Sequence, residues 1–130
     1  MNQSIFCLAL AAAGGIGVLL RAGCNALAVR GVPGGGLWAA PAATLFVNVL
    51  GSFLFGVAFA LAGPRPGVSP ALQPILLVGL LGGFTTYSSF SFHTVELLVA
   101  GRPGSALVYV TATNLLAVAA TWVGLRIAGG

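Results

Sequence analysis

Charged residues are almost missing from this 130-residue chain, which is 5% charged and 58% hydrophobic. A soluble domain usually carries about 25% charged residues, so a soluble fold of this size could not cover its surface with so few. The composition therefore excludes an ordinary soluble protein and indicates that lipid surrounds the chain. Its length suits a single domain over residues 1–130.

Acidic side chains are scarcer still, because Glu96 is the only one, while the basic residues are five arginines. The net charge of +4 could by itself indicate nucleic-acid binding. The arginines are dispersed, however, and stand at the ends of apolar runs, where long basic side chains reach lipid headgroups. We therefore expect a lipid bilayer, and no nucleic acid, as the partner of this charge.

Groups that carry out catalysis or bind metals through side chains are also sparse. The chain has one histidine, His93, one carboxylate, and two cysteines, Cys7 and Cys24. Both cysteines fall in the first apolar segment, about 25 Å apart if it is one helix, so they cannot pair within it. Catalysis needs a base with a nucleophile or a set of metal ligands, so we expect no enzyme. A membrane-anchored enzyme or an assembly subunit is the weaker alternative.

What the chain does contain is four apolar segments, at 4–20, 42–61, 74–100 and 106–125. Each is near the roughly 20 residues that a spanning helix needs, and short turns rich in Gly and Pro separate them. Residues 9–13 resemble a signal-peptide cleavage site, but no basic residue precedes this stretch, so we expect a retained first helix. The segments predict an all-α membrane protein with four transmembrane helices.

The arginines show almost no preference for one side of the membrane. If all four segments span, Arg65, Arg126 and the N-terminal amine lie on one side, and Arg30 and Arg102 on the other, with Arg21 near that second side. A chain without positive-inside bias can insert in both directions. The pattern therefore permits an antiparallel, dual-topology homodimer, which four short helices also favour because they enclose little space.

The third segment is interrupted near its middle, at 82–88, by two glycines and a run of threonine and serine that weaken a helix. A break in lipid leaves backbone groups unpaired, so it persists only where protein buries it or a watery cavity adjoins it. Broken helices bind ions in transporters, because free carbonyls attract cations and helix N-termini attract anions. We expect an ion site here rather than a simple glycine kink.

Polar side chains form stripes in the segments beside this break. Asn48 shares a helix face with Thr44, four residues before it, and Tyr109 shares one with Thr113. Such stripes often only join neighbouring helices, but several of them beside a broken helix favour a permeation path. They contain hydrogen-bond donors and lack carboxylates, so a small, hard anion fits best. Composition alone does not distinguish fluoride from other small anions.

Three motifs together resemble the Fluc family of fluoride channels, also called CrcB. They are GLLGGFTTYSSFS at 79–91, TLFVNVLGSF at 44–53, and GGIG at 14–17 followed by Arg21. The similarity spans nearly the full length, and the combination is more specific than any one motif. It implies a fluoride-specific channel in the plasma membrane of a prokaryote. Such a channel is an antiparallel homodimer with two pores, exports fluoride passively and gives fluoride resistance.

The resemblance also implies roles for individual residues along the fluoride path. Asn48 would line and gate the pore, and Tyr87 and Phe90 would turn their ring edges, which carry partial positive charge, toward fluoride. Arg21 could attract anions, or could only extend to the headgroups. A polar track would complete the path through Thr44, Tyr109 and Thr113.

A structural sodium ion at the dimer centre is the cofactor that the resemblance implies. The backbone carbonyls of Gly82 and Thr85 from each subunit would hold it, in line with the preference of hard cations for oxygen ligands. Three positions depart from the family pattern: Tyr87 replaces phenylalanine, His93 an acidic residue, and Ala117 the serine of some members.

A small proton-coupled drug exporter is the alternative function, because such proteins also have four helices and often insert in both directions. Proton-coupled exchange of a cation needs a carboxylate embedded in the membrane. The chain offers only Glu96, late in the third segment. Loss of drug resistance on replacing Glu96 would favour this alternative.

Overall fold

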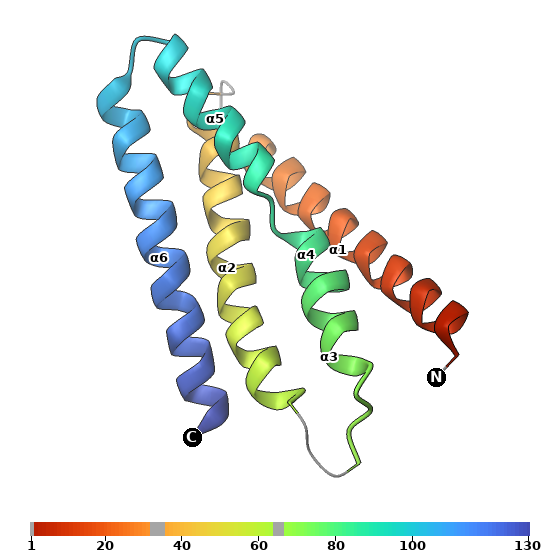
Figure 1. Cartoon of the computed structure of the whole chain (residues 1–130). Helices are drawn as coiled ribbons and strands as arrows, with labels where there is room; N and C mark the ends of the chain where they lie inside the picture. The colour runs from red at the N-terminus through yellow and green to blue at the C-terminus, as the bar shows by residue number, and fades with distance from the viewer. Residues whose placement is uncertain (1, 32–35, 64–66) are drawn as a thin grey trace.

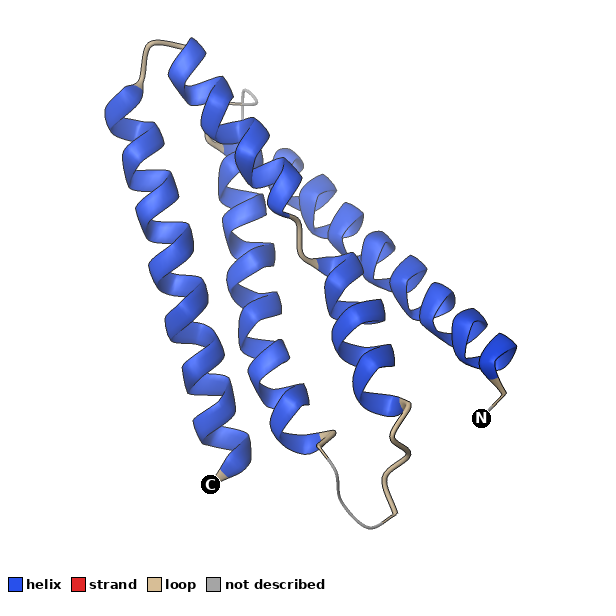
Figure 2. Ribbon diagram, in the orientation of Figure 1, coloured by secondary structure: helices blue, strands red, loops and turns tan. Residues whose placement is uncertain are grey.

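A computed structural model describes residues 2–31, 36–63 and 67–130, and this part of the chain is all-helical (Figure 2). Its four candidate membrane spans, Gln3–Ala28, Ala39–Leu61, Leu72–Val99 and Pro103–Gly129, agree with the predicted number of transmembrane helices. The elements in chain order are α1 (Gln3–Gly31), α2 (Ala39–Leu61), α3 (Leu72–Pro74), the π-helix η1 (Ile75–Leu81), α4 (Gly82–Phe84), α5 (Tyr87–Val99) and α6 (Pro103–Gly129).

Consecutive spans run in opposite directions, so both termini lie at one end of the bundle and the turn from α5 to α6 at the other (Figure 1). Arg126 lies in the last turn of α6, at the end with the termini. Arg30, in the last turn of α1, and Arg102, which precedes α6, lie at the opposite end. Arg65 lies outside the described residues.

The first helix is longer than the apolar segment 4–20 suggested. It begins at Gln3 and continues past Arg21 to Gly31, because the stretch after Arg21 contains no proline and includes Ala22, Ala26, Leu27 and Ala28, which favour a helix. Arg21 therefore does not end a helix, as its position after the apolar run had suggested. It lies inside the first span.

Glycines allow the spans to pack in two close pairs. In the α2–α6 pair, a Cβ added at Gly56 would lie 2.8 Å from the backbone nitrogen of Leu125. In the pair of α1 with the third span, a Cβ at Gly17 would lie 2.8 Å from the nitrogen of Phe84. Because lipid is as apolar as a leucine side chain, close packing of this kind is what holds helices together in a membrane.

The third span is broken, as predicted, at Thr85 and Thr86. Both residues are extended, with φ −81° and ψ 159° at Thr85 and φ −152° and ψ 115° at Thr86. Gly82 and Gly83 remain helical, so the β-branched threonines, rather than the glycines, make the break. Thr86 caps the next helix, since its hydroxyl accepts a hydrogen bond from the N–H of Ser89 at 3.2 Å. The π-helix before the break is a feature that the sequence did not suggest.

Candidate ion site at the helix break

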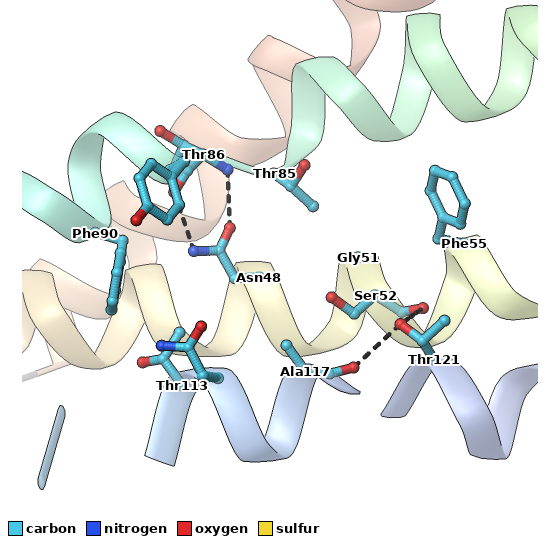
Figure 3. A pocket seen from close by; sticks show the side chains of 12 residues that line it. Asn48, Gly51, Ser52, Phe55, Thr85, Thr86, Phe90, Thr113, Ala117 and Thr121 are labelled. Carbon is cyan, nitrogen blue, oxygen red and sulfur yellow. Dashed lines mark hydrogen bonds between the residues drawn. The ribbon is translucent and has the colours of Figure 1, made fainter. Parts of the chain in front are cut away.

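The side-chain amide of Asn48, on α2, pairs with both backbone groups of Thr86 in the break. Its Nδ2 donates to the carbonyl oxygen of Thr86 at 3.0 Å, and its Oδ1 accepts from the N–H of Thr86 at 2.8 Å (Figure 3). The amide thus takes the place of a neighbouring peptide group. A break in lipid requires such partners, because an unpaired backbone group is costly there.

Arg21, on α1, supplies a further partner, because its Nε donates to the carbonyl oxygen of Gly83 at 3.2 Å. The N–H and hydroxyl of Thr85 both donate to the carbonyl of Leu81, each at 2.9 Å. The carbonyl oxygens of Gly82, Phe84 and Thr85 accept no hydrogen bond from any described residue. The two carbonyls expected to bind a cation, those of Gly82 and Thr85, are therefore both free to do so.

Carbonyl oxygens are also the metal ligands that this site offers best. Within residues 2–31, 36–63 and 67–130, no three His, Cys, Asp or Glu side chains lie together as a metal cluster. His93 and Glu96 bind each other instead, with 2.9 Å between Nδ1 and Oε2. A hard cation such as sodium takes oxygen ligands, so the free carbonyls of Gly82 and Thr85 fit it.

A cavity of about 290 Å³ lies between α2, the break and α6 (Figure 3). It brings together four of the residues predicted for the fluoride path, Asn48, Tyr87, Phe90 and Thr113, and none of its lining residues is charged. Arg21, Thr44 and Tyr109 do not line it. The remaining lining residues are Gly51, Ser52, Phe55, Thr85, Thr86, Asn114, Ala117 and Thr121.

Three aromatic rings lead from the mouth of this cavity into the protein. The ring centroids of Tyr87 and Phe90 are 5.4 Å apart with an interplanar angle of 47°, and those of Phe90 and Tyr109 are 5.4 Å apart at 39°. Tyr87 is 77% exposed, whereas Tyr109 is only 1% exposed. Tilted rings at this distance present edges to their surroundings as well as faces.

Two buried hydroxyl groups beside these rings make no hydrogen bond of good geometry. Among the described residues, these are the hydroxyls of Tyr109 and Thr113. The side chain of Thr44, on α2 and 1% exposed, lies close enough to the Tyr109 hydroxyl to interact with it. Because buried polar groups are nearly always hydrogen-bonded, each unpaired one calls for a partner such as a water or an ion.

Sequence reasoning did not single out Thr86, although Thr86 carries most of the hydrogen bonds at the break. A threonine just before a helical segment is a preferred N-cap residue and could have indicated it. The Thr86 hydroxyl also contacts that of Ser88 at 3.2 Å and that of Ser89 at 3.0 Å. On α6, the hydroxyl of Thr121 donates to the carbonyl of Ser52 at 3.1 Å, joining α6 to α2.

Comparison with known proteins gives one consistent result. A family described as "CrcB-like protein, Camphor Resistance (CrcB)" matches residues 8–125. Three similar proteins, each named as the fluoride-specific ion channel FluC, come from Thermus thermophilus, Rhodospirillum centenum and Paracoccus denitrificans. Their identities are 43%, 43% and 40%, over 94%, 92% and 95% of this chain and 94%, 92% and 94% of theirs, respectively.

Proposed function

The chain belongs to the CrcB family of fluoride-specific ion channels, and on that basis we propose that it exports fluoride from the cell passively and so gives fluoride resistance. Its four candidate membrane spans are those of a membrane channel, and its family is one of channels and not of enzymes. A membrane potential negative inside drives an anion outward by about 2.3 kcal/mol per 100 mV. No ATP is needed.

The observation that carries the proposed path is the set of unoccupied donors beside an uncharged cavity. The Tyr109 and Thr113 hydroxyls make no hydrogen bond of good geometry among the described residues, although Thr44 lies near that of Tyr109, and one of the two Nδ2 hydrogens of Asn48 remains after the other binds Thr86. Fluoride is small and accepts strong hydrogen bonds, so these donors can replace part of its water shell. The lining carries no full positive charge that would hold the ion too tightly for conduction.

The residues would act in sequence along this path. Asn48 meets the ion where the break opens into the cavity and is held in place by Thr86. The rings of Tyr87 and Phe90 present positive edges next. The polar track of Thr44, Tyr109 and Thr113 completes the path through α2 and α6.

The free carbonyls of Gly82 and Thr85 would hold a structural sodium ion, which supplies positive charge that fixes the break. Two carbonyls from one chain do not enclose a hard cation, which takes oxygen ligands on several sides. In the proposed antiparallel homodimer a second copy would bring the same pair, so that four carbonyls hold the sodium at the centre and one fluoride path runs on each side. The lack of charge bias between the ends of the spans permits this arrangement.

Fluoride efflux from liposomes, recorded with a fluoride electrode, tests the proposed function. Wild-type protein should release fluoride faster than empty liposomes and leave chloride inside. Phe90→Leu should slow the release strongly, because Phe90 lines the cavity. Phe92→Leu, on the same helix but 61% exposed and outside the cavity lining, is the matched control and should retain it. Wild-type release no faster than from empty liposomes would refute the proposal.

A further inference from the structure

Arg21 reaches the helix break because glycines bring α1 against the third span. A Cβ at Gly17 would lie 2.8 Å from the nitrogen of Phe84, and one at Gly83 would lie 3.2 Å from the Cα of Gly14. The two backbones are therefore in direct contact one helical turn before Arg21. The long side chain of Arg21, on the same face of α1 as Gly17, then extends to the end of the neighbouring helix.

Arg21 lies inside the first span, which runs from Gln3 to Ala28, about 10 Å along the helix axis from the Ala28 end at 1.5 Å per residue. A charged side chain inside a membrane span is costly unless it is paired. Its partner is the carbonyl of Gly83, next to the last residue of the helical half that ends at Phe84. Positive charge is stabilising there, because the unpaired carbonyls and the helix dipole make a helix C-terminus negative.

The hydrogen bonds at the break divide its carbonyls into occupied and free ones. In a continuous helix the N–H of Thr86 would bond to the carbonyl of Gly82, but it is donated to an amide on α2. Arg21 occupies the carbonyl of Gly83. The carbonyls of Gly82, Phe84 and Thr85 are left without a donor in the described chain, and the family resemblance selects Gly82 and Thr85 among them.

We propose that Arg21 is a positioning residue for the cation site rather than an attractor of anions. By binding the Gly83 carbonyl, it fixes the end of the first half of the third span. The neighbouring carbonyls of Gly82 and Thr85 then keep one direction toward the cation. This inference rests on the sodium site of the proposed function.

The two roles of Arg21 predict opposite effects on sodium binding. If Arg21 acts only as a positive charge, its removal strengthens the binding of a nearby cation, because like charges repel. If Arg21 positions the carbonyls, its removal leaves the Gly83 carbonyl unpaired and the helix end unfixed, so sodium binds more weakly. Loss of one charged hydrogen bond corresponds to about tenfold weaker binding.

Thermal unfolding of the purified full chain in detergent tests whether the removal of Arg21 strengthens or weakens sodium binding. Sodium chloride is titrated against N-methylglucamine chloride at constant ionic strength, for wild type, R21Q, R21K and R30Q. R30Q is the matched control, because it removes the same charge from the exposed last turn of α1. The sodium midpoint is the sodium concentration that gives half of the maximal rise in unfolding temperature. We expect R30Q to keep the wild-type midpoint, R21Q to have a midpoint about tenfold higher, and R21K to lie between them.

A sodium midpoint of R21Q at or below that of wild type overturns the positioning role. If R21Q does not fold, R21K decides: a midpoint above wild type supports the inference, and one equal to or below it overturns the inference. Fluoride efflux separates this result from the proposed function. If the wild type conducts no fluoride, the channel function is refuted, and the sodium titration still decides the role of Arg21. If the wild type conducts fluoride but its unfolding temperature does not depend on sodium, both the sodium site and this inference are overturned.

Discussion

At the scale of single residues, Asn48 has both a structural and a proposed conducting role. Its amide uses Oδ1 and one Nδ2 hydrogen to satisfy the extended backbone of Thr86, and the remaining hydrogen is available to the cavity. An aspartate would keep the acceptor but lose both donors and add a negative charge in the proposed anion path. A single amide therefore couples the geometry of the break to the chemistry of the path.

Asn48→Ala should lower the free energy of unfolding by on the order of 2–4 kcal/mol, because it leaves a buried N–H and a buried C=O unpaired. Thermal unfolding in detergent measures the effect. Asn114→Ala is the control, since the Asn114 amide is exposed and donates only to a carbonyl within α6, that of Val110. Equal stability of the two variants would contradict the role of Asn48 at the break.

Tyr109→Phe should slow fluoride efflux and leave the unfolding temperature unchanged or slightly raised. The hydroxyl it removes is buried and unpaired among the described residues, and an unsatisfied buried group costs about 1–3 kcal/mol. Thr121→Val is the comparison, because the Thr121 hydroxyl donates to carbonyls of Ser52 and Ala117, so its loss should reduce stability. A Tyr109→Phe protein that is clearly less stable would show that this hydroxyl has a structural partner.

At the scale of helices, the number of spans and the position of the break were predictable, because both follow from local composition. Apolar length gives the spans, and adjacent β-branched threonines disfavour a continuous helix. The contact of Arg21 with Gly83 was not predictable, because it depends on how α1 and the third span are aligned. That alignment comes from glycine contacts between distant parts of the chain, such as Gly17 with Phe84.

Some residues of the candidate site were likewise predictable from the sequence, and others were not. Asn48 and Thr113 were found from their spacing along a helix, and the cavity brings them together although they lie on different helices. The roles of Gly82 and Thr85 came from a family resemblance, because no composition shows which carbonyls lose their donors. The pairing of Asn48 with Thr86 was missed, since a side chain that replaces a peptide group has no periodic signature.

Gly17→Ala should destabilise the protein by about 1–3 kcal/mol, as overpacking does, because the new methyl group meets the backbone of Leu80 and Phe84. Gly15→Ala, two residues away on α1, is the matched control, since a Cβ there meets nothing within 4 Å. It should be neutral or stabilising by up to about 1 kcal/mol from helix propensity. Thermal unfolding of both variants checks this, and equal stability would contradict the close packing of α1 on the third span.

At the scale of the whole molecule, one copy of the chain leaves much apolar surface uncovered. Only 6% of the most apolar window of the first span and 28% of that of the third are buried. Tyr87, beside the cavity, is 77% exposed. Lipid can cover aliphatic side chains, but an ion path with an open side would expose the ion to hydrocarbon, where a charge is strongly disfavoured. The proposed homodimer would supply a protein surface at this position.

Dual insertion predicts that a cysteine placed after Gly130 is labelled from both sides of the membrane to similar extents. Serine replacements of Cys7 and Cys24 provide the background, because these are the only native cysteines. Labelling of intact cells with an impermeant reagent, before and after permeabilisation, gives the two fractions. Adding lysines at one end should shift the ratio and reduce fluoride efflux, whereas a native chain labelled from one side only would exclude dual insertion.

The two side chains that hydrogen-bond to the backbone of the break are synthesised before the break itself. Arg21 and Asn48 precede the break in the sequence, so a ribosome synthesises both before it reaches Thr86. When the third span is released into the bilayer, the groups that pair with its unwound peptide units are already available in α1 and α2. The least lipid-compatible part of the chain is therefore made after its partners and does not have to wait for them.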